Sequence, residues 1–98
     1  MQDIDQGLTQ LQLEPDNNKN LKAFVGELNG NIKILEKEFG VKIFQTGNKV
    51  TISGNQGDIQ KASNAINDLY ASTSNGVEIS REIIQMAINN NEGLEPEI

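Results

Sequence analysis

The sequence contains no cysteine and no histidine. Without cysteine the chain can form no disulfide, no thiolate nucleophile and no zinc–thiolate site. Without histidine it lacks the commonest general base and the commonest transition-metal ligand, so Ser–His–Asp and Cys–His catalysis are excluded. We therefore expect a non-catalytic chain that has no metal site and no cofactor site of its own.

Aromatic residues and long apolar runs are also scarce. The chain has three Phe, one Tyr and no Trp, so its core must consist mainly of Ile, Leu and Val. No uninterrupted apolar run approaches the ~20 residues that a transmembrane helix needs. Residues 1–5 lack the basic and apolar regions of a signal peptide. We expect a cytoplasmic protein without membrane contact, and 98 residues suffice for one domain.

The net charge of −6 is unevenly distributed along the chain. Residues 16–61 hold seven lysines against five acidic residues, a balance of +2, whereas residues 1–15 and 62–98 carry −3 and −5. A mildly basic middle is compatible with nucleic-acid binding and also with an ordinary solvated surface. The charge pattern leaves both interpretations open.

The spacing of apolar residues predicts the element order β-α-α-β-β-α, followed by one more short helix. We expect Asp16 to cap the first helix, Gly40 to end the second and Ser80 to cap the last. Loops are expected at residues 54–57, where Asn55 or residues 56–58 would open the next helix, and at residues 72–76. Strands are predicted at residues 8–13, 41–44 and 50–52, and the expected core includes Ile32, Leu35, Ile43, Ile52 and Ile66.

The same pattern predicts how the chain is divided. Residues 1–7 are expected to be a flexible N-terminus and residues 8–71 the domain itself. Residues 72–90 would form an appended helix, and residues 91–98 have the composition of an acidic linker.

Residues 25–43 resemble the centre of a KH domain. In that family a Gly-x-x-Gly loop joins two helices, the second helix carries Ile-x-x-Ile/Leu, and a glycine ends it before a Val-x-Ile strand. The resemblance implies an α+β fold with the eukaryotic-type KH order β-α-α-β-β-α, a three-stranded sheet with helices on one face, and a C-terminal helical appendage. The matching residues are Gly26, Ile32, Leu35, Gly40, Val41 and Ile43.

The loop departs from the family pattern at its fourth position. Its residues are Gly26, Glu27, Leu28 and Asn29, with no Lys or Arg between the ends. KH loops place backbone N–H groups against the nucleic-acid backbone, and Glu27 would repel phosphate there. Because Asn29 can adopt a positive φ, we expect the turn to form. Because Glu27 repels phosphate, we expect nucleic-acid binding to be weak.

A longer stretch, about residues 8–90, is similar to the amino-terminal segment of PhoH-like proteins, which are cytosolic ATPases. The similarity is carried by the runs at residues 13–18, 24–32, 35–36, 39–43 and 47–48. It implies a following P-loop ATPase domain that uses ATP and Mg²⁺, and links to RNA metabolism and to a YbeY-type endoribonuclease. This sequence has no Gly-x-x-x-x-Gly-Lys-Ser/Thr motif, so we expect such a domain beyond the acidic linker of a longer protein.

The predicted binding site combines the loop with three nearby lysines. The loop could also be a simple helix joint, and the lysines could be solvated charges interleaved with Glu36 and Glu38. Phe39 and Phe44 could stack on bases, but their spacing places both in the core, which we prefer. The predicted site residues are Gly26, Glu27, Leu28, Asn29, Gly30, Lys33, Lys37 and Lys42.

Two functions are compatible with the sequence. The favoured one is a non-catalytic module that binds single-stranded RNA weakly and guides the attached ATPase. The alternative is a protein-contact module that docks on its own ATPase domain, forms a homo-oligomer or recruits a partner. The basic middle favours the first, whereas the incomplete loop and the acidic total favour the second.

Overall fold

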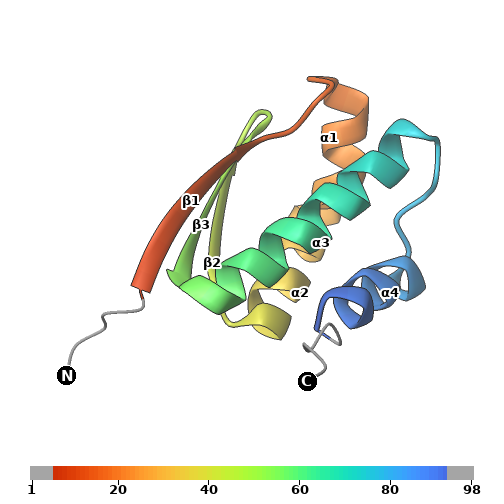
Figure 1. The fold of residues 1–98 in the computed structure, drawn as a ribbon. Coiled ribbons are helices and arrows are strands. Elements are labelled where there is room, and N and C mark those ends of the chain that lie inside the picture. The colour runs from red at the N-terminus through yellow and green to blue at the C-terminus, as the bar shows by residue number, and fades with distance from the viewer. Residues whose placement is uncertain (1–5, 93–98) are drawn as a thin grey trace.

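The computed structural model describes residues 6–92 and shows the predicted α+β order. Strand β1 (Gln6–Gln12) is followed by α1 (Asn18–Val25), a short 3-10 turn η1 (Glu27–Asn29) and α2 (Gly30–Phe39). Then come β2 (Lys42–Thr46), β3 (Lys49–Asn55), α3 (Gln56–Ser74) and α4 (Arg81–Glu92). The fold prediction is therefore confirmed (Figure 1).

The three strands form one antiparallel sheet in the order β1-β3-β2. The register pairs Thr9 with Ile52 and Ile52 with Ile43 on one face. The next residues along these strands point to the other face, because successive side chains of a strand alternate. All the helices lie on one side of the sheet (Figure 1), so the sheet has a covered face and an open face.

The core lies between the covered face and the helices. Helix α3 crosses the sheet and contacts β1, β3, α1, α2 and α4. It therefore lies at the centre of the packing between the sheet and the other helices. Phe24 and Tyr70 meet edge to face, with ring centroids 6.0 Å apart. The five core residues predicted from the sequence are all buried, as expected: Ile32, Leu35, Ile43, Ile52 and Ile66.

Phe44 is a correction to the core prediction. Phe39 is buried as expected, but the side chain of Phe44 is 65 % exposed. Val41 and Ile43 both point into the core, and a strand alternates its side chains, so Phe44 must point to the open face. The alternation of side chains along the strand therefore decided the direction of Phe44, although its ring is large and hydrophobic.

Helix ends agree with most of the predicted caps. Gly40 ends α2 with φ 68°, and the Ser80 hydroxyl accepts a hydrogen bond from the Ile83 N–H at 3.2 Å. The predicted N-cap Asp16 is wrong by one residue, because Asn17 accepts the bond from the Asn20 N–H. The separate loop expected at residues 54–57 does not form, because β3 runs directly into α3. The expected opening of this helix at Asn55 is confirmed, since the Asn55 side chain accepts from the Gly57 N–H at 2.9 Å.

The outer boundaries also differ from the expected ones. Strand β1 begins at Gln6, two residues before the strand expected from the sequence. Helix α3 continues to Ser74, so the expected break at residues 72–76 begins only after it. Helix α4 packs against α3 and extends to Glu92, into the first part of the expected linker. The remaining predictions for the two ends, residues 1–5 and 93–98, lie outside the described residues.

Candidate nucleic-acid interface

A groove of about 380 Å³ lies between α1 and the hairpin formed by β2 and β3. One wall is a face of α1, and the other is the end of β2 with the turn that follows it. Aliphatic side chains, two amide side chains and one lysine meet there. The lining residues are Asn18, Leu21, Lys22, Val25, Gln45 and Gly47.

Hydrogen bonds beside the groove hold the segment that precedes α1 in place. The Leu13 N–H donates to the Asn48 carbonyl at 2.7 Å, and the Asn48 side-chain amide donates to the Leu13 carbonyl at 3.0 Å. The Tyr70 hydroxyl on α3 donates to the Pro15 carbonyl, just before α1. These bonds fix the segment that leads into α1 against both the turn and α3. The groove is therefore held at its width by the body of the domain.

The loop from Gly26 to Gly30 continues directly from the α1 wall, because Val25 lines the groove and Gly26 follows it. Gly26 has φ 78°, and a Cβ at this position would come within 2.8 Å of the Asn31 side-chain nitrogen. That nitrogen donates to the Phe24 carbonyl at 3.0 Å and so closes the end of α1. A glycine is required here both by the backbone and by the close contact.

The predicted positive φ at Asn29 is found, at 60°, and Leu28 next to it has φ 53°. A leucine rarely adopts this left-handed conformation, and residues held in it concentrate at functional sites. Leu28 is also 87 % exposed, and Glu27 beside it is exposed. The loop therefore presents an acidic and an apolar side chain where typical KH loops present a basic one.

The structure brings most of the predicted site residues together, but not all of them. Gly26 to Gly30 form the loop at the end of the groove, and Lys33 and Lys37 lie exposed one turn apart on α2, which begins at Gly30. Lys42 alternates with buried Ile43 and pairs with Ser53. Its side chain therefore lies on the open face of the sheet, on the other side from the helices.

The groove residues themselves were not among the predicted site residues. A sequence signal did exist on α1, because Asn18, Leu21, Lys22 and Val25 share one helix face at spacings of three, four and seven. Nothing in the sequence shows that Gln45 and Gly47 form the opposite wall. That wall depends on how the hairpin packs beside α1.

Two kinds of feature were not found among the described residues. Within residues 6–92 no cluster of three potential metal ligands is found. None of the helices in this part of the chain is long and apolar enough to cross a bilayer.

Residues 17–68 match the family model of the KH domain, which covers more than half of the chain. The chain therefore belongs to the KH domain family. The match runs from the N-cap of α1 through most of α3, so it contains the loop and all the residues that line the groove. No curated protein matches the sequence.

Solved structures from archaea share this fold. A protein of unknown function from Aeropyrum pernix matches with a TM-score of 0.71 and 18 % identity over 94 % of this chain and 50 % of that one. Dim2p from Pyrococcus horikoshii matches with a TM-score of 0.71 and 18 % identity over 90 % and 51 %. A chain of the a/eIF2alpha–aDim2p–rRNA complex of the same organism matches with a TM-score of 0.72 and 18 % identity over 94 % and 50 %. The present chain thus spans about half the length of these proteins.

Proposed function

We propose that this domain binds single-stranded RNA in the groove between α1 and β2, with the loop Gly26 to Gly30 at the end of the bound segment. The observation that carries the proposal is the groove itself. Leu21 and Val25 give it an apolar lining for the faces of bases, while Asn18 and Gln45 can hydrogen-bond base edges. Lys22 supplies the one formal charge among the lining residues, and it attracts phosphate.

The comparisons support an RNA ligand. KH domains as a family clamp a short stretch of single-stranded nucleic acid beside the Gly-x-x-Gly loop. One of the structures with the same fold is a complex that contains rRNA. Fold alone does not fix function, so the groove residues rather than the fold must be tested.

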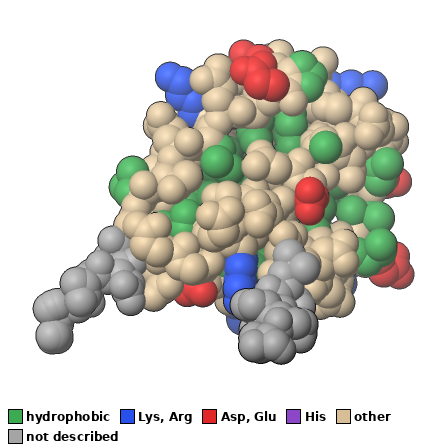
Figure 2. Space-filling model, in the orientation of Figure 1, with side chains coloured by type: hydrophobic (Ala, Val, Ile, Leu, Met, Phe, Trp, Pro, Cys, Tyr) green, Lys and Arg blue, Asp and Glu red, His purple; other side chains and the backbone are tan. Residues whose placement is uncertain are grey.

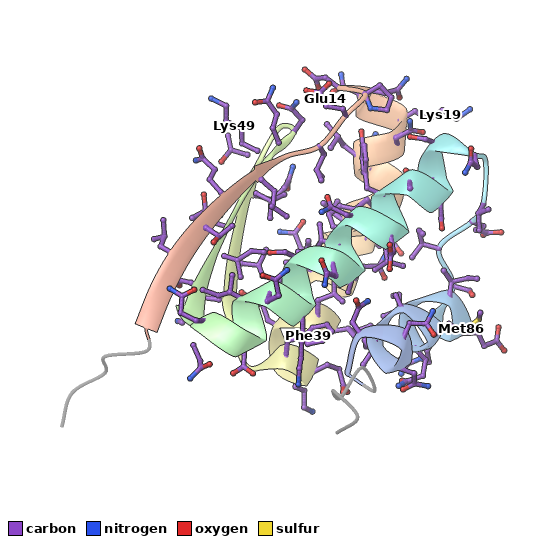
Figure 3. All side chains as sticks on the ribbon, in the orientation of Figure 1. Glu14, Lys19, Phe39, Lys49 and Met86 are labelled. Atoms are coloured by element: carbon purple, nitrogen blue, oxygen red, sulfur yellow. The ribbon has the colours of Figure 1, made fainter. Side chains whose placement is uncertain are left out.

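The test is a titration of a labelled RNA of about four nucleotides, the length that one KH loop clamps. Lys22→Glu should weaken binding roughly tenfold or more, because it reverses the one charge that lines the groove. Lys19→Glu is the matched control on the same helix. Lys19 is exposed and points away from the body of the domain at the start of α1 (Figure 3), and it does not line the groove. Equal effects of the two substitutions would contradict binding in the groove.

We propose further that the chain is a non-catalytic part of a PhoH-like protein, in which it guides an ATPase acting in RNA metabolism. The support is the resemblance over about residues 8–90. On this proposal ATP and Mg²⁺ belong to the ATPase domain, and a YbeY-type endoribonuclease is a candidate partner. The chain alone should then show no saturable micromolar ATP binding. A version extended through the P-loop should bind ATP and the same RNA.

One observation favours the alternative of a protein-contact module. The loop tip carries Leu28, the most exposed large apolar side chain of the described residues, next to the acidic Glu27. An apolar tip beside a carboxylate suits a protein surface better than it suits phosphate. A partner that protects the Leu28 loop from hydrogen exchange without affecting the groove would support this second function.

A further inference from the structure

The open face of the sheet carries an unusual set of side chains for so acidic a protein. The strands β1, β2 and β3 contain two lysines and no acidic residue, although the chain as a whole has 14 acidic residues and a net charge of −6. Both lysines, Lys42 and Lys49, are exposed. Figure 3 shows Lys49 at the hairpin end of the sheet, on the side away from the helices.

Phe44 lies between these two lysines on the same face. It is two residues from Lys42 along β2, about 7 Å, since a strand rises about 3.4 Å per residue. It pairs with Thr51, so Lys49, two residues before Thr51 on β3, is its diagonal neighbour at about 7–8 Å. An exposed aromatic ring with a cation on either side is the arrangement that holds a base by stacking and the adjoining phosphates by charge.

Apart from Leu8, the remaining side chains of the face are small or carry amides and hydroxyls. At the hairpin end the Gln12 side-chain amide, on the residue paired with Lys49, donates to the Glu14 carboxylate at 3.2 Å. Thr51 lies next to Phe44, and Gln10 lies next to Thr51 on β1. These groups donate and accept hydrogen bonds, and they leave the Phe44 ring free on its outer side. The only other large apolar side chain exposed on the face is Leu8, which the register places one row away and two strands over.

The groove and this face share strand β2, which is an edge of the sheet. Gln45 lines the groove, while its neighbour Phe44 points to the open face. Within residues 6–92 no strand lies beyond β2, so a strand of RNA can pass from the groove around this edge. The same edge is less suited to pairing with a second copy of the chain. The Glu36 carboxylate already accepts the Ile43 N–H there, at 2.8 Å.

We propose that the open face of the sheet is a second contact surface for single-stranded RNA, on which Phe44 stacks on a base and Lys42 and Lys49 contact phosphates. The inference goes beyond the proposed function, which places RNA in the groove alone. It predicts that a longer RNA continues from the groove across the edge of β2 onto the face.

Another hollow on the molecule serves as a contrast. It measures about 180 Å³ between α3 and α4, and it is lined by Asp68 and Met86 among others but by no basic residue. On the side of the molecule seen in Figure 2, the blue and red side chains are scattered and form no single patch. Among the described surfaces, the open face is the one that combines an exposed aromatic ring with lysines and no carboxylate on its strands.

The experiment compares two RNAs with the same 5′ sequence, one of about four and one of about ten nucleotides. Phe44→Ala should leave the affinity for the short RNA unchanged and weaken the long one about 5- to 150-fold, the loss expected for one stacked base. Lys42→Gln with Lys49→Gln should lower the slope of log affinity against log salt by about 1.4 for the long RNA only. Met86→Ala is the control, since Met86 is 58 % exposed on α4 and points outward (Figure 3).

Two further variants separate stacking from general apolar contact. Phe44→Leu keeps an apolar side chain without a ring, so it should behave like Phe44→Ala. Phe44→Trp should bind the long RNA at least as well as the parent. Because the parent chain contains no Trp, the tryptophan introduced by this substitution would be the one source of Trp fluorescence. We expect the long RNA to quench that fluorescence and the short RNA to leave it unchanged.

The outcomes are distinguishable. If Phe44→Ala binds the long RNA like the parent, the proposal is wrong. If Phe44→Leu binds like the parent, or if Phe44→Ala instead abolishes self-association, the face is a protein contact. If neither the parent nor any variant binds the short RNA, while binding of the long RNA still depends on Phe44, the proposed groove site is wrong and the proposed site on the open face stands. Failure of the parent to bind either RNA at low salt would overturn both.

Discussion

The two faces of the sheet are made from alternate residues of the same three strands, yet they differ in almost every property. On the covered face Ile43, Val50 and Ile52 are buried under the helices. On the open face Phe44 and Leu8 are exposed among polar side chains and two lysines. The comparison teaches that the helices, and not the hydrophobicity of each strand residue, decide which side chains form the core.

The largest expected effect is a difference in stability between substitutions on the covered face and on the open face of the sheet. Ile52→Ala on the covered face should lower the free energy of unfolding by about 2–5 kcal/mol, because it leaves a cavity at a fully buried position. Phe44→Ala removes a larger side chain, but it should change stability by less than about 0.5 kcal/mol because the ring is exposed. Denaturant titration of both variants measures this. Similar midpoint shifts for the two would mean that the open face is covered in solution.

A smaller effect should separate the lysines by the RNA that they contact. Lys33→Glu with Lys37→Glu reverses two charges on α2, next to the loop, and should weaken binding of the short and the long RNA by about tenfold or more. Lys42→Glu should weaken only the long RNA, since Lys42 lies on the open face. Titrations of both RNAs at low and moderate salt measure the effects of these two variants. A loss of short-RNA binding in Lys42→Glu would show that the two faces do not act separately.

The smallest effect concerns the loop, where we expect a gain. Glu27→Lys with Asn29→Gly should tighten RNA binding several-fold, roughly 1 kcal/mol, by replacing a repelling carboxylate with an attracting amine. The fold should be retained, because Glu27 is exposed and Asn29 already has φ 60°, which glycine adopts freely. The short RNA is the probe. Unchanged affinity in a folded variant would indicate that the loop contacts a protein rather than RNA.

Much of the fold could be predicted because the signals that build it are local. The alternation of strand residues and the helical spacing of Ile32, Leu35 and Phe39 specify which side of each element is apolar. The loop residues were found through their resemblance to the Gly-x-x-Gly loop of KH domains, and the structure gives both Gly26 and Asn29 a positive φ. The predicted N-cap missed by one residue, because Asp16 and Asn17 are both competent caps and the choice depends on how the preceding segment is held.

The sequence by itself determined the order of the elements, their apolar faces and most of their ends, because these depend on residues within one or two turns of each other. Only the tertiary structure decided where the groove lies, since bonds between Leu13 and Asn48, 35 positions apart, hold the segment that leads into α1 against the hairpin turn. It also decided that the helices all cover one face of the sheet, so that Lys42 lies away from Lys33 and Lys37. Pairing between distant strands sets the register, and a register assigns every side chain to one face of the sheet at once.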